Sequence, residues 1–372
     1  MNIAHLSTQT AYYGGEVYLV SLAAGMHARG HQVSCCVRPD SELAARLAAL
    51  KIPTQVLPLV DWFDPQSVIR LRRWLRRNDV QILHSHSPRD YYLAAMASGR
   101  TRVVNVGTRH HLHPLRHRYL KRPFLKRFAT MIAVSHAVAR SLHTSGVIDP
   151  DRIVTIHNGV DVLRDLPRRD GLRRQIDLDD ATPVIGYVGQ LCPDKGVETL
   201  LHAVRLLLDA GGDGLHVFVV GEDQCRGRYR HKLERLTHDL DLARSVHFFG
   251  YVDDAARAAA DFDVQVVCSR AEPFGLVTLE AMAHRHPVVA TAAGGSLEIV
   301  RDGIDGFLVP AGDAPLLADR LQRLLANPEL RRRQGARGRA RVVAQFSLAR
   351  MLDRTESVYR IALESVAMRA MS

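Results

Sequence analysis

Short β-rich runs alternate with amphipathic helical patterns along the whole of this chain of 372 residues. Strand candidates in the first half begin at Asn2, Val33, Thr54, Val80, Val103, Thr130 and Arg152. Helical patterns separate these candidates; in one of them, apolar side chains recur three and four residues apart from Leu19 to Met26, and Gly30 ends the pattern. Strands that alternate with helices in this way predict βαβ units and a parallel sheet.

A second alternating series begins near residue 183. Its strand candidates are PVIGYVG, LHVFVVG, SVHFFGYV, DVQVVCS, PVVATAA and GFLVP. Between the two series, residues 163–182 are charged and have no strand pattern, so we interpret them as an inter-domain segment with a leading helix. After Ala314 the pattern is almost wholly helical, and its last part, from Leu348 to Met371, is long enough to return to the first domain.

These patterns predict an α/β protein with two doubly wound, Rossmann-like domains. We place the first domain at residues 1–165, completed by a C-terminal helix at 350–372, and the second at residues 175–349. The length agrees with two domains, because single hydrophobic cores stop growing at about 250–300 residues.

Positive charge is concentrated in the first half of the chain. Residues 1–165 hold 22 Lys and Arg against 11 Asp and Glu, whereas residues 166–372 hold 28 of each kind. A basic half favours a phosphate-bearing partner, such as nucleic acid, acidic lipid headgroups or phosphorylated glycans. Because there is no long apolar run, no secretory signal pattern and no CxxC spacing among the five cysteines, we expect a cytoplasmic protein without disulfides.

The strongest local motif is CSRAEPFGLVTLEAMAHRHPVVATAAGG, residues 268–295. A buried-type strand ends at a loop with Glu272, and Gly275 then opens a helix that carries Glu280. Ligands of open α/β sheets bind at the carboxyl ends of the strands, where Glu272 is expected. The backbone amides of residues 274–277 suit an anion such as a diphosphate. Taken singly, the two glutamates also fit a helix N-terminal carboxylate and a solvated helix face.

Glu272 and Glu280, with seven residues between them, resemble the signature of the retaining glycosyltransferases of family 4 (glycosyl transferases group 1), whose fold is called GT-B. The flanking EPFGLVTLEAMA and GGSLEIVRDGIDGFLVPAGD are similar to that family as well. The resemblance implies that Glu272 approaches the hydroxyls of the donor sugar and Glu280 the ribose of the nucleotide. It also implies that Phe274, Gly275 and Leu276 contribute to donor binding.

Residues 14–33, GGEVYLVSLAAGMHARGHQV, resemble the first glycine loop and helix of the same family. There, the resemblance implies that Gly14 and Gly15 let the backbone come close to the transferred sugar or the diphosphate. Paired glycines between a strand and a helix remove side-chain bulk and allow a positive φ.

Two strand ends in the first half carry histidines, namely His84, His86, His110 and His111. The resemblance implies a histidine near the reaction centre at the end of the second strand, and we select His110, with His111 as the neighbouring alternative. A neutral imidazole there would hydrogen-bond the donor sugar or orient the acceptor. Two other interpretations stay open: His84 as a core residue, and a zinc site that includes His113 and His117.

The segment GYVGQLCPDKGVETLLHAV resembles the phosphate-binding loop of the family, in which Gly189 and Lys195 match. One position departs from the family, because Gln190 stands where many members have arginine and brings no positive charge. Lys195 remains as the cation, and Arg270 is a candidate substitute. FFGYVDD resembles the segment whose backbone contacts the base, which places Tyr251 near the donor. The carboxylates of DLD (239–241) and DFD (261–263) fit helix ends or loops, so we expect no metal and no cofactor.

Two basic segments, residues 70–77 and 109–127, hold 5 and 7 Lys or Arg and no acidic side chain. Apolar and aromatic side chains interleave with them, which is typical of an interfacial helix or a headgroup-facing surface. For residues 70–77 a solvated helix face is an equal alternative. In the second segment we predict a surface for the acceptor or for an anionic membrane, formed by Arg109, His111, Arg116, Arg118, Lys121 and Arg122. The low aromatic content, 6%, and the lack of an RNA-binding motif argue against nucleic acid.

Taken together, the sequence predicts a retaining GT-B glycosyltransferase with catalytic Glu272, His110 and Lys195. Its expected partners are a nucleotide-diphosphate sugar and a glycan or lipid-linked acceptor of the cell envelope, for example in lipopolysaccharide assembly. A peripheral association with the inner face of the cytoplasmic membrane is left open. The alternatives are a GT-B nucleotide-sugar epimerase and a non-catalytic nucleotide-sugar-binding protein. The donor sugar, base, acceptor, linkage and oligomeric state are not determined by the sequence.

Overall fold

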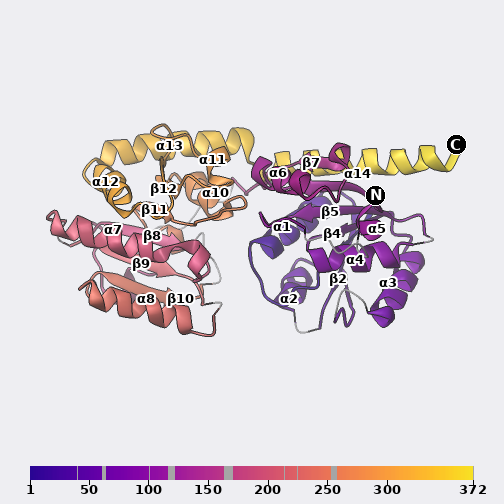
Figure 1. The fold of residues 1–372 in the computed structure, drawn as a ribbon, viewed down its shortest axis with the longest axis horizontal. Helices are drawn as coiled ribbons and strands as arrows, with labels where there is room; N and C mark the ends of the chain where they lie inside the picture. Colours follow the sequence, from indigo (N-terminus) through magenta and orange to yellow (C-terminus); the bar gives the residue numbers. More distant parts are fainter. Residues whose placement is uncertain are drawn as a thin grey trace. The chain divides into compact units, whose positions relative to one another are not determined.

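The computed structural model describes residues 1–39, 41–60, 64–99, 101–115, 122–162, 171–212, 214–223, 225–252 and 258–371, without the side chains of residues 367 and 369–371. The chain forms two compact units. We call residues 1–158 with 348–372 the first unit, and residues 159–347 the second unit. The boundary lies between Asn158 and Gly159, and both chain termini belong to the first unit (Figure 1).

The first unit is built on a parallel sheet of seven strands in the order β3-β2-β1-β4-β5-β6-β7. The strands are β1 (Asn2–Leu6), β2 (Gln32–Val37), β3 (Thr54–Val56), β4 (Ile82–Ser85), β5 (Val104–Arg109), β6 (Phe128–Ala133) and β7 (Ile153–Thr155). The helices are α1 (Gly14–Ala28), α2 (Glu42–Ala49), α3 (Pro65–Arg77), α4 (Pro88–Ala97), α5 (Arg122–Leu125), α6 (His136–Ser145) and α14 (Leu348–Met371).

The second unit holds a parallel sheet of six strands in the order β10-β9-β8-β11-β12-β13. The strands are β8 (Val184–Val188), β9 (His216–Val220), β10 (Val246–Gly250), β11 (Val264–Val267), β12 (Val288–Thr291) and β13 (Phe307–Val309). The helices are α7 (Val197–Asp209), α8 (Arg228–Asp239), α10 (Leu276–Ala283), α11 (Ser296–Ile299), α12 (Ala314–Leu325) and α13 (Pro328–Gln345).

The prediction of an α/β fold with two parallel sheets is confirmed. Each predicted strand of the first half starts within two residues of an observed one. The sequence also predicted a leading helix within 163–182. In the described residues 171–182, the structure has only a short 3₁₀ turn, Arg174–Ile176, in place of this helix, and residues 163–170 lie outside the described residues. The turn ends at Asp177, whose φ of 52° is left-handed and incompatible with a continuing helix.

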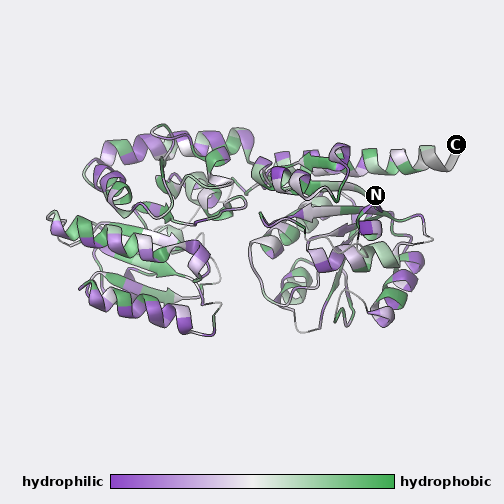
Figure 2. Ribbon diagram, viewed as in Figure 1, coloured by the Kyte–Doolittle hydropathy of each residue, from purple (hydrophilic) through white to green (hydrophobic). Residues whose placement is uncertain are grey.

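Hydrophobic strands and two-faced helices account for this architecture. The strands of the second unit are mostly apolar, those of the first unit mix apolar and polar residues, and many helices carry an apolar face and a polar one (Figure 2). Parallel strands covered on both faces need such apolar runs. Polar caps fix where the helices begin: the Asp64 carboxylate accepts the Ser67 N–H at 3.1 Å and Ser135 Oγ accepts the Val138 N–H at 3.1 Å.

The C-terminal helix α14 packs in the core of the first unit, against α1, β5 and β6. Gly25 of α1 permits the close approach, because a Cβ at this position would clash with the Leu352 side chain. Arg29, just after α1, pairs with Asp353 at 2.7 Å and with Glu356 at 3.0 Å. Although α14 follows the second unit in sequence, it is therefore a structural part of the first.

Each sheet reverses its strand order once, between β1 and β4 in the first unit and between β8 and β11 in the second. In open α/β sheets such a reversal leaves a crevice at the carboxyl ends of the two strands, and ligands bind there. The candidate site residues are therefore expected beside these two reversals.

Candidate functional site

The loops after β8 and β11 bring a cation and a carboxylate together in the second unit. Lys195 Nζ lies 2.8 Å from Glu272 Oε2, and Ser269 Oγ donates to the same oxygen at 2.9 Å. Glu272 is 8% exposed, whereas the side chain of Lys195 is 26% exposed. The predicted pair of catalytic residues, 77 positions apart in the sequence, is thus in direct contact.

The two loops can approach each other because Gly196 has no side chain. Its φ of 64° is left-handed, and a Cβ there would clash with the carbonyl oxygen of Cys268. Two further contacts hold the loops together: Cys268 Sγ donates to the Lys195 carbonyl oxygen at 3.2 Å, and the Arg270 N–H donates to the Asp194 carbonyl oxygen at 2.8 Å. Arg270, the candidate substitute cation, therefore lies beside the Lys195 turn.

Helix α10 begins directly after Glu272, as the sequence predicted. Gly275, with a φ of 114°, is the N-cap of the helix. The ring of Phe274 is buried, so only the backbone of Phe274 is available to a ligand. Leu276 and Glu280 are half-buried. The first N–H groups of α10 have no partner within the helix and carry its positive dipole end, which suits a negative group of a ligand.

Gly189 and Gln190 follow β8, and Tyr251 follows β10. The Tyr187 hydroxyl donates to the backbone carbonyl of Gln190 at 2.9 Å, so this loop is held by its backbone. Strand β10 is two places away from β8 in the sheet, and Tyr251 is 49% exposed. The structure thus brings Lys195 and Glu272 into contact, while Tyr251 lies at another strand end.

In the first unit, Gly14 and Gly15 form the start of α1, directly after the loop from β1. A Cβ on Gly15 would lie 3.9 Å from the His110 ring, so the glycine loop and the predicted site histidine are neighbours. Glu16 Oε2 accepts the Tyr13 N–H at 3.1 Å and caps this helix start. His111 is exposed, so His110 is the histidine on the glycine-loop side.

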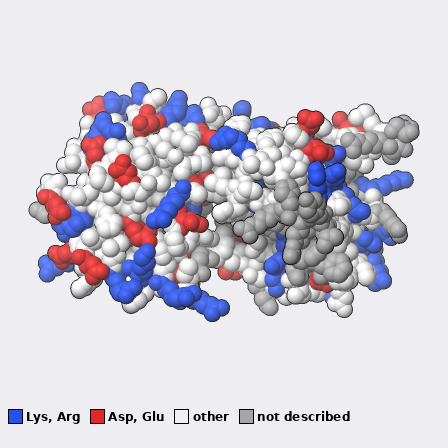
Figure 3. Space-filling model, viewed as in Figure 1, with Lys and Arg blue, Asp and Glu red and all other residues white. Residues whose placement is uncertain are grey.

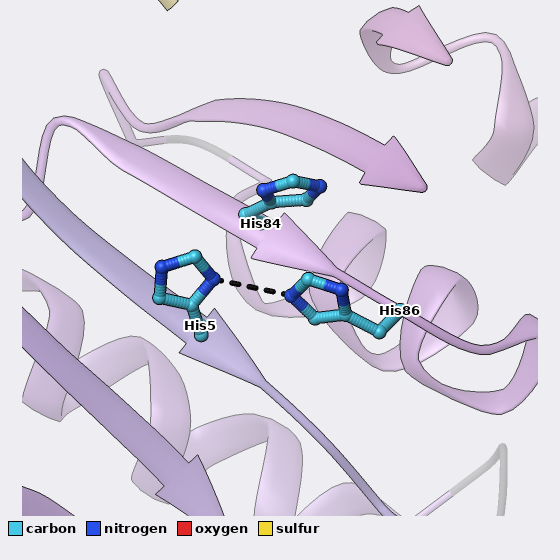
Figure 4. Close-up of side chains that lie close together, drawn as sticks. All are labelled: His5, His84 and His86. Atoms are coloured by element: carbon cyan, nitrogen blue, oxygen red, sulfur yellow. Dashed lines mark hydrogen bonds between the residues drawn. The ribbon is translucent and has the colours of Figure 1, made fainter. Parts of the chain in front are cut away.

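His110, which is half-buried, lies beside a cluster of three buried histidines, His5, His84 and His86, from β1 and the end of β4. His5 and His84 are direct partners in the register of β1 and β4, and His86 lies two residues further along on the same face. His5 Nδ1 and His86 Nε2 are 3.1 Å apart and hydrogen-bonded, and His84 stacks on His86 with 4.4 Å between ring centroids (Figure 4). The His86 and His110 rings are 6.1 Å apart.

Burial keeps these histidines uncharged. It lowers the pKa of His5 and of His110 to about 3, and it lowers the pKa of His84 and His86 well below the usual value, with a further contribution from the neighbouring rings. Burial has the opposite effect on the nearby carboxyl groups: it raises the pKa of Glu16 to about 7 and that of Asp90 to about 6. Asp90 accepts N–H groups of Thr8 and His86.

The ring nitrogens of His5, His84 and His86 lie within 4.8 Å of one another, a spacing that a metal ion can bridge. However, His84 already uses both nitrogens, toward the Tyr359 hydroxyl at 2.6 Å and Thr108 Oγ1 at 2.7 Å. The outer nitrogens of His5 and His86 are buried without a hydrogen-bond partner, whereas metal-bound histidines donate that N–H to an acceptor. The arrangement thus fits a hydrogen-bonded cluster better than a metal site. The zinc site considered from the sequence also included His113, which is exposed, and His117, which lies outside the described residues.

The predicted acceptor or membrane surface needs one correction. Arg109 ends β5 and is 4% exposed, and its guanidinium donates to the His113 carbonyl oxygen, so it does not face a membrane. Arg122 is exposed, whereas Arg116, Arg118 and Lys121 lie outside the described residues. On the face drawn in Figure 3, most of the charged side chains visible at the right-hand edge of the first unit are Lys and Arg, while both charge signs are mixed over the second.

Residues 70–77 lie on α3, where Val68, Leu71 and Leu75 are buried and Arg73 and Arg76 are exposed. The apolar side of this helix therefore faces the core, as the solvated-face alternative required. Within the described residues, no helix combines the length and apolar character needed to span a bilayer.

Comparisons with known proteins match both halves of the chain. The model "Glycosyl transferases group 1" matches residues 168–341, and "Glycosyltransferase Family 4" matches residues 12–164. A phosphatidyl-myo-inositol mannosyltransferase of Mycobacterium leprae is 31% identical over 366 residues, which cover 93% of this chain and 92% of that protein. The chain belongs to the group 1, family 4 glycosyltransferases.

One further relative supports this family assignment, and a solved structure shows the same fold. A lipopolysaccharide core biosynthesis glycosyltransferase of Rhizobium meliloti, LpsE, is 26% identical over 351 residues, 91% of this chain and 94% of that protein. The crystal structure of Anabaena HepE in complex with UDP and glucose has a TM-score of 0.85 at 23% identity and covers 96% of this chain and 99% of its own. The predicted GT-B fold is thereby confirmed.

Several residues of the two sites had no signal in the sequence. His5 lies 79 residues before His84, and Tyr18, Thr108 and Tyr359 come from three different elements, so only the folded sheet brings them together. Ser269 precedes Glu272 in the resembling motif, but its hydrogen bond to the carboxylate depends on the loop conformation.

Proposed function

We propose that the glycosyltransferase moves a sugar from a nucleotide-diphosphate donor to a hydroxyl of a cell-envelope glycan or lipid acceptor, with retention of configuration. The second unit holds the donor, and the first unit holds the acceptor. The observation that carries this proposal is the Lys195–Glu272 pair at the reversal of the second sheet. The names of relatives in inositol lipid mannosylation and lipopolysaccharide core synthesis support the envelope acceptor.

In this reaction negative charge develops on the departing diphosphate. Lys195 and the N–H groups at the start of α10 stabilise that charge, since a cation and oriented dipoles act strongly in a partly buried site. Because Lys195 supplies the positive charge, the proposed reaction needs no metal ion. Glu272 is an acceptor of hydrogen bonds and holds the hydroxyls of the donor sugar, while Ser269 keeps its carboxylate in place. Glu280 contacts the ribose.

On the side of the acceptor, His110 is the proposed site residue of the first unit. It is neutral at physiological pH, because burial lowers its pKa to about 3, so it acts as a hydrogen-bond partner and not as a cation. Gly14 and Gly15 allow the sugar to approach the backbone beside it. The exposed basic side chains of the first unit, such as Arg122, face an acceptor with phosphate or an anionic headgroup at the inner face of the cytoplasmic membrane.

A transfer assay tests the proposal. The purified enzyme is incubated with UDP-, GDP- and ADP-sugars, each with a lipid and a glycan fraction of a bacterial envelope, and products are identified by mass spectrometry and NMR. We expect a new glycoside with the anomeric configuration of the donor, and its loss in Glu272→Ala. An inverted product would contradict retention. Conversion of the donor sugar without any acceptor would favour an epimerase instead.

A further inference from the structure

The C-terminal helix α14 places two polar side chains, Thr355 and Tyr359, inside the first unit. Tyr359 is fully buried, and its hydroxyl lies 2.6 Å from His84 Nδ1, with the two rings edge to face. Thr355 Oγ1 donates to the Met351 carbonyl oxygen of its own helix at 2.8 Å and is also a hydrogen-bond partner of Tyr18. The remaining buried side chains of α14, among them Met351, Leu352 and Val358, are apolar. A phenylalanine would cover the same apolar surface, whereas a buried hydroxyl is tolerated only when it is hydrogen-bonded. The hydroxyl of Tyr359 is therefore the hydrogen-bond partner that holds His84.

From His84 the hydrogen bonds continue toward the candidate site. His84 Nε2 lies 2.7 Å from Thr108 Oγ1, and Thr108 Oγ1 lies 3.4 Å from the Tyr18 hydroxyl. The Tyr18 ring then packs edge-on against His110, with 4.9 Å between the ring centroids. A continuous set of contacts thus leads from α14 through β4 and β5 to α1 and to His110.

In a neutral imidazole, the hydrogen bonds at the two ring nitrogens depend on each other. Such a ring has one N–H donor and one acceptor nitrogen, so a bond at Nδ1 determines what Nε2 can do. The bond to Tyr359 thereby fixes the ring plane of His84 and couples its two nitrogens, because a ring that accepts at Nδ1 donates at Nε2, and the reverse. Because the hydroxyl of Thr108 bonds the other nitrogen, its orientation toward Tyr18 follows from the same choice. Buried polar networks of this kind are stiff when every member is satisfied.

We propose that α14 positions His110 for transfer, with Tyr359 as a positioning residue that acts through His84, Thr108 and Tyr18. Tyr359 is fully buried in the core of the first unit, and it acts on the site by holding the rings between it and His110. The inference rests on the proposed function, in which His110 is a site residue. It goes further by assigning a role in turnover to a helix at the far end of the sequence.

Steady-state kinetics of Tyr359→Phe test the proposal. The assay measures turnover of UDP-glucose, or of whichever nucleotide sugar the transfer assay selects. We expect kcat to fall about tenfold while the KM for the donor stays within twofold, because the predicted Lys195–Glu272 donor site lies in the second unit. An unchanged kcat would overturn the proposal.

A matched control variant distinguishes the positioning of His110 from the packing of α14. Glu356, on the same helix, pairs with Arg29 and Arg360 and has no part in the contacts that lead to His110. Glu356→Gln therefore weakens the docking of α14 without altering those contacts, and its kcat is expected to match the wild type. An equal fall in kcat for both variants would contradict the proposal. If Tyr359→Phe does not fold, Thr108→Val interrupts the same contacts from inside the sheet and is expected to lower kcat in the same way.

A second readout does not depend on activity. With ¹⁵N-labelled histidine, the imidazole signals of His84 and His110 are assigned from His84→Gln and His110→Gln, and their tautomers are read from the nitrogen shifts. We expect the His110 signals to shift in Tyr359→Phe and in Thr108→Val, and to stay in place in Glu356→Gln. Unchanged His110 signals in the first two variants would overturn the inference, even if transfer is measured. Failure of the wild type to transfer any sugar would instead refute the proposed function, and the NMR comparison would still decide the positioning.

Discussion

The two units reverse their strand order in the same way, but they place different kinds of polar groups at the reversal. Between β8 and β11 of the second unit, Lys195 and Glu272 form an ion pair that is partly open to solvent. Between β1 and β4 of the first unit, His5, His84 and His86 are buried and neutral. We call the β8–β11 reversal of the second unit the charged reversal, because it carries an ion pair. We call the β1–β4 reversal of the first unit the neutral reversal, because its histidines are uncharged and hydrogen-bonded.

This difference agrees with the division of labour in a glycosyl transfer. The charge of a diphosphate donor is best met by a cation that keeps access to the ligand, as Lys195 does. A sugar hydroxyl is neutral and is best recognised by fixed neutral donors and acceptors. In the proposed function, the two units therefore offer different chemistry at the same place in the fold, set by a few residues at and after the strand ends.

The largest expected effect comes from removing the cation of the charged reversal. In Lys195→Ala, the developing diphosphate charge loses its main partner, and we expect transfer to fall by about 10²–10³-fold. The measurement is kcat/KM for the donor. Lys232→Ala is the control, since Lys232 forms an ion pair of similar length with Glu198 on an exposed surface and is expected to leave transfer unchanged. Equal losses in both variants would show that Lys195 has no special role.

The next effect concerns the approach of the two loops. A Cβ in Gly196→Ala must clash with the Cys268 carbonyl oxygen and occupy a left-handed φ, so we expect a loss of about 3 kcal/mol in the free energy of unfolding. Gly211→Ala, after the end of α7, has a φ of 87° and open space around it, and about 1 kcal/mol is expected there. Chemical denaturation measures both. Similar losses in the two variants would contradict the proposed close approach.

The third effect is the pH dependence of stability that the buried histidines of the neutral reversal cause. His5 has a pKa of about 3 in the folded protein against an ordinary value of 6.5, so the unfolded chain binds more protons between these values. Its contribution to stability is complete above pH 6.5 and falls by about 1.4 kcal/mol per pH unit as the pH drops toward 3. Glu16 opposes this between pH 4.5 and 7, because its raised pKa destabilises the folded state as the pH rises.

Replacing His5 tests this sign directly. We expect His5→Gln to reduce the acid slope of the unfolding free energy by about 1.4 kcal/mol per pH unit. The second unit contains no tryptophan, so the fluorescence of Trp74, on α3, reports the unfolding of the first unit. A variant with the same slope as the wild type between pH 6.5 and 5 would show that His5 is protonated in the folded protein.

The smallest expected effect is that of a chelator. If the histidines of the first unit are hydrogen-bonded partners, EDTA or phenanthroline leaves both transfer and melting temperature unchanged. A fall in either value that is restored by zinc, and is absent in His86→Gln, would show that the cluster binds a metal and would remove the contrast between the two reversals.

Local pattern was enough to predict most of the architecture. Short β-rich runs that alternate with helical patterns were visible in the sequence, and they predicted both parallel sheets. The segment before β8 was harder, because Arg173 and not an apolar face holds it: the buried guanidinium donates to Asp263 and to three backbone carbonyl groups. Asp261 accepts the Leu172 N–H and Asp263 accepts from Arg173, so both carboxylates of DFD at 261–263 hold this segment.

The candidate sites were predictable to different degrees. Glu272 and Lys195 stand in strings that resemble a family, so both could be selected before their contact was known. Arg109 was misplaced, because sequence alone does not distinguish a basic residue at the buried end of a strand from one in the exposed loop after it. The contacts of Tyr359 were invisible, since 275 residues separate it from His84 and only the return of α14 joins them.

The central claim is that the charged reversal binds the nucleotide while the neutral one serves transfer. Isothermal titration calorimetry of UDP, GDP and ADP with the wild type, Lys195→Ala and His110→Ala tests it most directly. We predict that one nucleotide binds the wild type, that Lys195→Ala weakens its binding at least tenfold, and that His110→Ala binds it within twofold of the wild type. Binding that survives in Lys195→Ala but is lost in His110→Ala would contradict the account.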